Sequence, residues 1–198
     1  MMSVRHISDR AGDRPDPRDG YLDAAHACIL DVGWRRTTLT EVARRAGVSR
    51  MTIYRTWSDM QTLLGDLMTR EWTAIAAARP PGDGPTGLVG MMIATVQALR
   101  DNELFVRIVE LDPELLLPYL LSRRGRSQEF VLDLLAARIE QCQARGEIRA
   151  GDPLAIARAL VLGAHGFVLS SHTMVDDRVS EVTLDAELAE LVSRALAP

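Results

Sequence analysis

The segment best suited to recognise another molecule covers residues 50–55, which combine two arginines, hydroxyl groups and a methionine. An arginine can donate two hydrogen bonds to a guanine edge in the DNA major groove, and Met51 or the Thr52 methyl group suits a thymine methyl. The hydroxyls of Tyr54 and Thr40 can donate to phosphate oxygens, which fix position without specifying sequence. This combination predicts DNA binding, although an ordinary solvated helix face has similar polarity.

Two short helices must position these side chains. Thr38 begins the first with a predicted capping box, in which its hydroxyl accepts from the amide of Glu41 and the Glu41 carboxylate reaches back. Gly47 stands where a positive φ would end this helix and turn the chain. Val48 is expected to fill the turn, and Ser49 to cap the second helix. The inward-facing residues are predicted to be Leu39, Val42, Ala43, Ala46, Ile53 and Trp57.

This pattern predicts a helix-turn-helix, although on its own it also fits a plain helical hairpin. The second helix would present its polar face to DNA, and the first would contact the phosphate backbone. The predicted DNA contacts are Thr38, Thr40, Ser49, Arg50, Met51, Thr52, Tyr54 and Arg55.

Residues 33–64 resemble the DNA-binding signature of the tetracycline-repressor (TetR) family. The resemblance is carried by Gly33-Trp34, Thr37-Thr38, Ala46-Gly47-Val48-Ser49, Thr52-Ile53-Tyr54, Trp57 and Leu63-Leu64. It implies a three-helix DNA-binding domain that begins with a helix at about 18–32, followed by a helical domain that binds a ligand and dimerises. Met60 departs from the family pattern because a phosphate-contacting lysine is common there. Met51 also departs, since a small residue is usual at its position.

Helical periodicity continues along the chain and predicts an all-α fold. The helices are expected at about 17–32, 39–46, 50–56, 59–78, 86–100, 102–110, 113–121, 126–145, 152–173 and 182–196. Gly33 is predicted to stop the first of these, while Asp152 caps the penultimate one and Pro153 begins it. The chain divides into a disordered, arginine-rich arm (1–17), a helix-turn-helix DNA-binding domain (18–58) and a helical ligand-binding and dimerisation domain (59–198).

The last two helices are predicted to form a homodimer interface. Small residues in the helix at 152–173 would permit close packing, and the last helix carries an apolar stripe of Leu184, Leu188, Leu191, Val192 and Leu196. Pairing with their copies would make a four-helix interface, whereas the alternative is that both helices pack inside one protomer. A dimer would set two recognition helices about one DNA turn apart, as a pseudo-palindromic operator requires.

A small-molecule pocket is expected between the helix at 59–78 and the helices at about 86–145. Its predicted lining is Trp72, Met91, Met92, Thr95, Val96, Phe105, Leu120 and Phe130. Methionines and aromatics suit an adaptable apolar site, although ordinary cores use the same residues. We expect a repressor whose apolar effector lowers its DNA affinity, because the effector binds the DNA-free arrangement better. Activation instead of repression stays open at this point.

Charge is unevenly distributed along the chain. Residues 1–57 carry ten arginines against seven acidic residues, a balance of +3, whereas the whole chain has a net charge of −4. A mildly basic segment on an acidic body is typical of a local DNA-binding face. Cys28 and Cys142 make no disulfide or metal framework and are expected to be buried, in a reducing cytoplasm. The first 20 residues do not resemble a signal peptide, and no stretch approaches 18 apolar residues, so no membrane span is expected.

The motifs of other functional classes are missing from the sequence. It has no nucleophile elbow, P-loop, dinucleotide fingerprint or zinc-ligand set, so no enzyme activity, cofactor or metal is expected. His165 and His172 lie two helical turns apart without a third ligand and are expected in an interface or core. The arginines of residues 123–126 suggest an anion site, or more simply a solvated loop. The remaining alternative is a helical interaction module with reduced or lost DNA binding, which Met60 would be the first residue to indicate.

Overall fold

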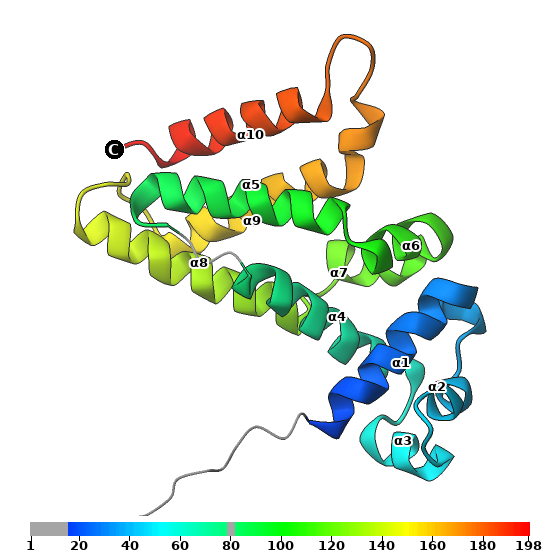
Figure 1. The fold of residues 1–198 in the computed structure, drawn as a ribbon. Coiled ribbons are helices and arrows are strands. Elements are labelled where there is room, and N and C mark those ends of the chain that lie inside the picture. The colour runs from blue at the N-terminus through cyan, green and yellow to red at the C-terminus, as the bar shows by residue number, and fades with distance from the viewer. Residues whose placement is uncertain (1–15, 79–81) are drawn as a thin grey trace, which may run out of the picture.

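Ten α-helices account for most of residues 16–78 and 82–198, the part of the chain that the computed structural model describes. They are α1 (Pro17–Val32), α2 (Leu39–Arg45), α3 (Arg50–Thr56), α4 (Met60–Ala77), α5 (Gly84–Arg100), α6 (Glu103–Leu111), α7 (Leu117–Leu121), α8 (Arg126–Ala144), α9 (Pro153–Ser170) and α10 (Glu181–Leu196). Short 3-10 turns are η1 (Trp34–Arg36), η2 (Pro113–Leu115) and η3 (Ser171–Thr173). These described residues contain no strand, and the all-α fold is confirmed (Figure 1).

One predicted helix is divided in the structure. The expected helix at 113–121 consists of η2 followed by α7, with Leu116 between them. Pro118 explains the break, because a proline in a helix interior lacks the amide hydrogen and its ring clashes with the carbonyl one turn earlier. The helix therefore restarts just before Pro118, which lies in the first turn of α7.

Local signals place the helix ends where the sequence predicts them. Gly33 ends α1 at a φ of 81°, a left-handed conformation that favours glycine. The Asp152 side chain accepts a hydrogen bond of 2.9 Å from the Leu154 amide, and Pro153 is the first residue of α9. Most of the expected arm, residues 1–15, lies outside the described residues.

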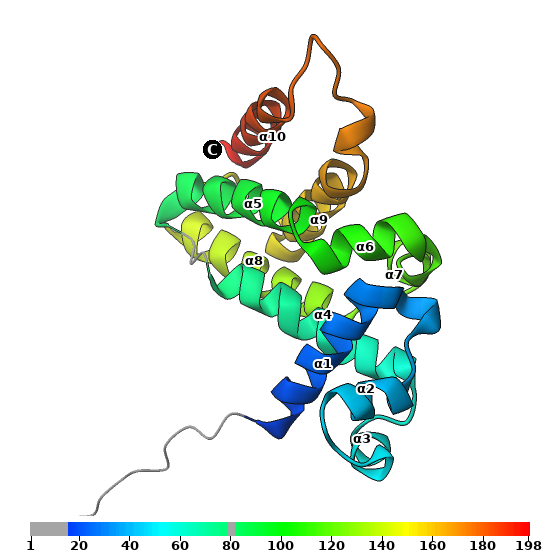
Figure 2. The same ribbon diagram turned by 45° about the vertical axis from the view of Figure 1, so that its right-hand side comes forward.

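A first hydrophobic core unites α1, α2, α3 and the first half of α4. Its fully buried side chains include Ile29, Val42, Ile53, Trp57 and Leu63. Leu104 and Ile108 of α6 also join it, so α1 packs against α6 as well as α4 (Figure 2). We call α1–α3 the head and the helices from α5 onward the body; α4 connects the two.

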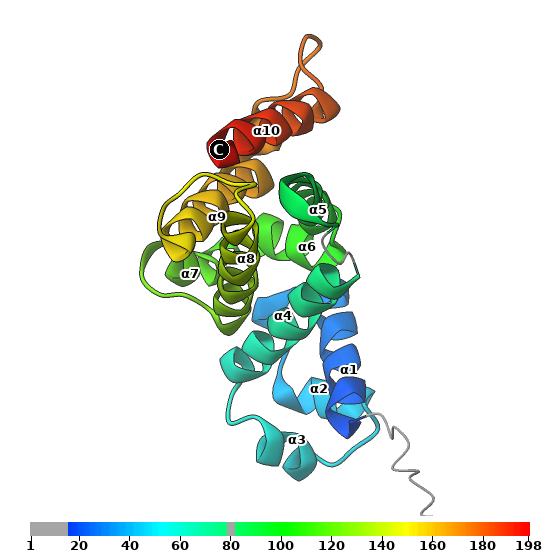
Figure 3. The ribbon, with the colours of Figure 1, turned by 90° about the vertical axis from the view of Figure 1, so that its left-hand side faces the viewer.

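A second core lies within the body, between α5, α8, α9 and α10. Helices α8 and α9 pack closely together, and α10 covers α5 at the end of the molecule farthest from α3 (Figures 1 and 3). The predicted stripe of α10 is divided between two environments. Leu188, Val192 and Leu196 are buried in this core, whereas Leu191 is 59% exposed.

A buried carboxylate joins the head to the body. Asp112, at the end of α6, is 3% exposed and accepts a 3.0 Å hydrogen bond from the Trp34 amide. Its other oxygen lies 3.3 Å from the Arg35 side chain, which also pairs with Glu114. The hydrogen bond from Arg35 lowers the pKa of Glu114. These contacts tie the turn between α1 and α2 to the start of η2.

Helix α9 together with η3 is long and apolar enough to cross a membrane by length and composition alone, a criterion that core helices of soluble proteins also meet. Its mean hydropathy is 1.6, and 22% of this apolar stretch is buried within the protomer. Its leucines and valines, with Ile156 and Phe167, account for this value, and Arg158 is its single arginine. Much of the apolar surface of α9 is therefore not covered by the protomer itself.

Candidate functional site

Helix α2 begins with half of the predicted capping box. The Thr38 hydroxyl accepts a 3.2 Å hydrogen bond from the Glu41 amide, as expected. The Glu41 carboxylate does not reach back to Thr38, because Arg44 one turn later donates to both of its oxygens at 3.0 and 2.6 Å. These hydrogen bonds lower the pKa of Glu41. A charged partner thus replaces the second hydrogen bond of the capping box.

The turn between α2 and α3 has the predicted geometry. Gly47 adopts a φ of 68°, and Val48 packs against the first core. The Ser49 hydroxyl accepts from the Thr52 amide at 3.2 Å and lies 2.9 Å from the Thr52 hydroxyl. The Thr52 methyl group takes no part in these hydrogen bonds.

Helix α3 has one buried face and one exposed face. Ile53 is fully buried and Trp57, directly after the helix, is 1% exposed, as the spacing predicts. On the outer face, Met51 is 67% and Tyr54 49% exposed. The remaining outward residues are Arg50 and Arg55, and neither has a carboxylate partner among the described residues. An exposed methionine between two arginines without carboxylate partners has the chemistry that suits contact with base edges in the DNA major groove.

Asp66 of α4 anchors the end of α3. Its Oδ2 accepts a 2.7 Å hydrogen bond from the Trp57 indole, while Oδ1 pairs with Arg126 at the start of α8. Arg18 of α1 lies 3.5 Å from the same carboxylate, and its guanidinium stacks over the Trp57 ring. Partial burial raises the pKa of Asp66, but the hydrogen bonds from Trp57 and Arg126 outweigh it and lower that pKa. Asp66 thus connects α1, α3, α4 and α8.

A cavity of about 150 Å³ inside the body, here called the apolar cavity, is lined almost entirely by apolar side chains. The predicted residues that line it are Trp72, Met91, Met92, Thr95, Val96, Phe105 and Leu120. The prediction is wrong for Phe130, which is 47% exposed and does not line the cavity. The helical register explains this difference, because Ser127, Val131 and Leu135 present a different face of α8.

Helix α9 completes the apolar cavity, a contribution that sequence reasoning missed. It supplies Val161, Ala164, His165, Val168 and Leu169. Their spacing of three and four residues could have indicated from sequence that this side of α9 lines the cavity. The same spacing, however, also suits a dimer interface. Burial lowers the pKa of His165, which therefore favours the neutral imidazole at neutral pH.

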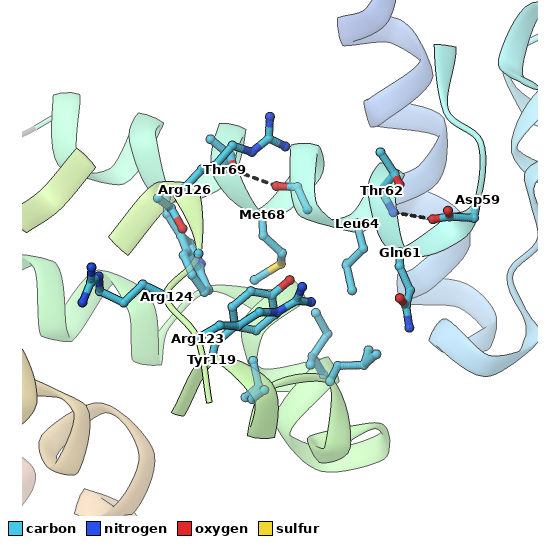
Figure 4. A pocket seen from close by; sticks show the side chains of 17 residues that line it. Asp59, Gln61, Thr62, Leu64, Met68, Thr69, Tyr119, Arg123, Arg124 and Arg126 are labelled. Carbon is cyan, nitrogen blue, oxygen red and sulfur yellow. Dashed lines mark hydrogen bonds between the residues drawn. The ribbon is translucent and has the colours of Figure 1, made fainter. Parts of the chain in front are cut away.

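A second cavity of about 330 Å³ lies between the first half of α4, α7 and the start of α8. We call it the arginine-lined cavity because Arg123, Arg124 and Arg126 contribute to its wall. Figure 4 shows Met68 and Tyr119 facing each other across it, with Arg123 beside Tyr119 and Arg124 directed away. The two cavities share Trp72, Leu116, Tyr119 and Ser127 as lining residues, so they adjoin each other.

Helices α9 and α10 both expose apolar side chains, which lie beside charged ones such as Arg158 and Glu190. Leu162 is 70% exposed, and Ala155, Ala159, Gly163 and Gly166 occupy the same side of α9 at spacings of three and four residues. On α10 and before it, the exposed apolar side chains are Leu191, Val182, Met174 and Val175. The exposed apolar side chains and small residues of α9, with Leu191 of α10, are candidates for contact with another molecule.

A helix-turn-helix head on a helical body with an internal cavity is the architecture of a DNA-binding transcriptional regulator. Residues 22–67 match the family described as bacterial regulatory proteins, tetR family. An uncharacterized HTH-type transcriptional regulator of Mycobacterium bovis is 34% identical over 184 residues, which are 92% of this chain and 96% of the relative. The chain belongs to the TetR family and is a DNA-binding transcriptional regulator.

Solved structures show the same fold. The TetR-family repressor AlkX from a Dietzia strain, implicated in n-alkane biodegradation, is 22% identical with a TM-score of 0.66, over 92% of this chain and 96% of that one. A complex of SmeT with triclosan is 23% identical with a TM-score of 0.60, over 92% of each chain. The family consists of regulators, not enzymes, which confirms the expectation drawn from the missing catalytic motifs.

Proposed function

We propose that this regulator is a repressor that binds a pseudo-palindromic operator as a homodimer and is released from it by a small-molecule effector. The exposed outer face of α3 is the observation that carries the DNA-binding part. There, Arg50 and Arg55 would donate to guanine edges and Met51 would contact a thymine methyl. Tyr54 and Thr40 would donate to phosphates, which fixes the register of the helix.

The proposed DNA interface also includes the residues that begin the two helices. Thr38 and Ser49 each keep hydrogen-bonding capacity after capping, because a hydroxyl has one donor and two acceptor positions. Thr52 would contribute its methyl group. We infer that this interface and its supporting helices form a DNA-binding domain of residues 18–58, preceded by an arm (1–17), with residues 59–198 as the ligand-binding and dimerisation domain.

The homodimer would form through α9 and α10. The exposed Leu162 and Leu191, together with the small residues on α9, supply an apolar surface that a second copy would cover. This also accounts for a helix that is apolar yet only 22% buried in the protomer. A two-fold axis at this surface would relate two copies of α3, as a pseudo-palindrome requires.

The effector would occupy the apolar cavity and favour an arrangement that does not fit the operator. The location of the cavity supports this proposal, because its wall combines α4, which joins the head, with α9, which would form the dimer. Among the structural neighbours, AlkX is described as a repressor, and SmeT was solved in complex with triclosan. As a bacterial regulator of this kind, the protein would act in the cytoplasm.

The proposed function is tested by selecting bound duplexes from a randomised DNA library. We expect wild-type protein to enrich a pseudo-palindrome, and a Tyr54→Ala, Arg55→Ala double variant to lose this enrichment. Each lost contact should cost about 1–3 kcal/mol of binding free energy. Arg178→Ala, in the exposed loop before α10, is the matched control and should select the same sequence as wild type.

Two other outcomes would overturn the proposal. If neither wild type nor the control enriches any sequence while both are folded dimers, the protein is an interaction module without DNA recognition. Substitution Met60→Lys would then test whether the missing cation at the start of α4 is responsible. If the double variant selects the same palindrome as wild type, the outer face of α3 is not the recognition surface.

A further inference from the structure

We propose that the effector is an amphipathic anion, with its apolar tail in the apolar cavity and its negatively charged head group bound by Arg123 and Arg126 in the arginine-lined cavity. We further propose that the head group competes with Asp66 for Arg126 and thereby loosens the anchor at the end of α3. The inference rests on the proposed effector function and specifies its ligand class.

The two cavities have complementary chemistry and a common wall. One is apolar and encloses about 150 Å³, and the other encloses about 330 Å³ and includes three arginines. Trp72 and Tyr119 line both, so a ligand that extends past these side chains would contact each environment. A molecule with one apolar end and one charged end matches this arrangement.

The charge balance of the arginine-lined cavity favours an anion. Its lining contains Arg123, Arg124 and Arg126 and one carboxylate, that of Asp59; just outside the lining, Asp66 pairs with Arg126 and Glu129 lies 3.7 Å from Arg124. The Asp59 side chain already accepts hydrogen bonds from the Thr62 amide at 2.7 Å and the Ser58 hydroxyl at 3.0 Å. It therefore caps α4 and does not neutralise the arginines.

The arginines differ in their availability. Arg124 lies 3.7 Å from Glu129 and points away from the cavity (Figure 4). Arg123 has no carboxylate partner among the described residues, and its guanidinium lies 5.0 Å from the centre of the Tyr119 ring. Stacking of this kind orients the guanidinium while leaving its N–H groups free for an anion. Arg123 is therefore better placed than Arg124 to donate hydrogen bonds to the head group of a ligand.

Trp72 supplies an independent indication of a ligand. Its indole Nε1 is buried and has no hydrogen-bond acceptor in the described structure. A buried donor without a partner is unfavourable, and it is usually satisfied by a ligand or water. Because Trp72 lines both cavities, an oxygen near the junction of head group and tail would provide the missing acceptor.

Arg126 connects this site to the DNA-binding head. It pairs with Asp66 Oδ1, while Oδ2 of the same carboxylate holds the Trp57 indole at 2.7 Å. Trp57 directly follows α3. A head group that draws Arg126 away would remove one of the partners of Asp66 and one link between α8 and the head. Ligand binding and the position of α3 would thus be coupled.

The test uses calorimetric binding of three probes to the full-length dimer: decanoate, 1-decanol and acetate. We expect decanoate to bind at least about tenfold more tightly than 1-decanol, because the carboxylate gains charge-assisted hydrogen bonds. Acetate should bind too weakly to detect, since it lacks the tail. Decanoate should also weaken binding to the selected operator.

Variants assign the effect to individual residues. Arg123→Gln and Arg126→Gln should each lower decanoate affinity about tenfold and leave 1-decanol affinity unchanged. Arg124→Gln is the matched control and should behave as wild type. Asp66→Asn should have the opposite effect and raise decanoate affinity, because Arg126 is no longer shared, while decanoate then releases less DNA. Circular dichroism checks that each variant is folded.

Three results would overturn the inference. The first is that decanoate and 1-decanol bind with equal affinity. The second is that Arg123→Gln and Arg126→Gln both keep the wild-type preference for decanoate over 1-decanol. If both probes bind equally and Thr95→Phe abolishes binding, the apolar cavity remains the effector site and only the anionic head group is wrong. Failure of all probes to bind would also overturn it. Failure of operator selection, by contrast, would count against the proposed function itself.

Discussion

The head and the body of this regulator are built on different principles. In the head, large side chains such as Ile53 and Trp57 are fully enclosed, and the exposed face of α3 is polar apart from Met51 and Tyr54. The body has the apolar cavity, shares the arginine-lined cavity with α4, and leaves the apolar residues Leu162 and Leu191 in solvent. A closed core suits a recognition surface of fixed shape. An open one suits a domain that must accept a ligand and a second copy.

Polar contacts are also used differently in the two regions. The polar contacts of the head lie at helix ends or at its junctions with α4 and α6, as at Asp66 and Asp112. In the body, Arg100 of α5 donates two 2.7 Å hydrogen bonds to Asp185 of α10, and both side chains are largely buried. Gln97 adds a 2.8 Å hydrogen bond to the same carboxylate. This ion pair fixes α10 on α5 and so orients the proposed dimer surface.

The substitution with the largest expected effect is Trp57→Ala in the head. It removes a fully buried aromatic side chain and leaves Asp66 without its indole donor. We expect a loss of about 3–5 kcal/mol in the free energy of unfolding. Urea unfolding monitored by circular dichroism measures this loss. Met92→Ala, at the wall of the apolar cavity, is the comparison and should cost less, since its surroundings are already open. Equal losses would remove the contrast between a closed and an open core.

Arg100→Met should destabilise the body by about 3 kcal/mol, because it leaves the buried Asp185 carboxylate without its cation. The double variant Arg100→Met, Asp185→Leu should recover most of this loss, since no buried charge then remains unpaired. Thermal unfolding of the two variants provides the measurement. A double variant as unstable as the single one would show that packing, not charge pairing, holds α10 against α5.

Leu162→Arg should dissociate the proposed homodimer, because two arginines would meet across the two-fold axis. We expect the dimer dissociation constant to rise at least about 100-fold, which corresponds to about 2.8 kcal/mol. Sedimentation analysis over a range of concentrations measures it. Leu121→Arg is the matched control, since Leu121 is 77% exposed but lies on α7. A dimer that persists in the first variant would place the interface elsewhere.

Ser49→Ala should have the smallest effect, about 1 kcal/mol, because only the cap of α3 is lost. The free energy of unfolding from urea titration is the readout. Ser193→Ala provides a comparison within the body, where the hydroxyl donates to a carbonyl of its own helix and caps nothing. That variant should remain within about 0.5 kcal/mol of wild type. A larger loss for Ser193→Ala would contradict the assignment of a capping role.

Much of the local structure follows from the sequence alone. Gly33, Gly47, Ser49 and Asp152 act at the helix ends that the sequence predicts, because a helix end depends on residues within one turn of each other. The inward positions of Ile53 and Trp57 follow from the helical period for the same reason. Both the helix-turn-helix and the family can therefore be identified from the order of the amino acids.

Only the tertiary structure decided how distant segments meet. Sequence periodicity indicated that α9 is apolar, but not that His165 faces a cavity while Leu162 faces solvent, because an apolar stripe does not specify which neighbour covers it. Glu41 pairs with Arg44 instead of completing its capping box, and Phe130 turns away from the cavity. Asp66 contacts residues from α1, α8 and the end of α3, and the most distant of them in the chain, Arg126, is 60 positions away from it. Such contacts depend on the packing of whole helices, and no local pattern encodes them.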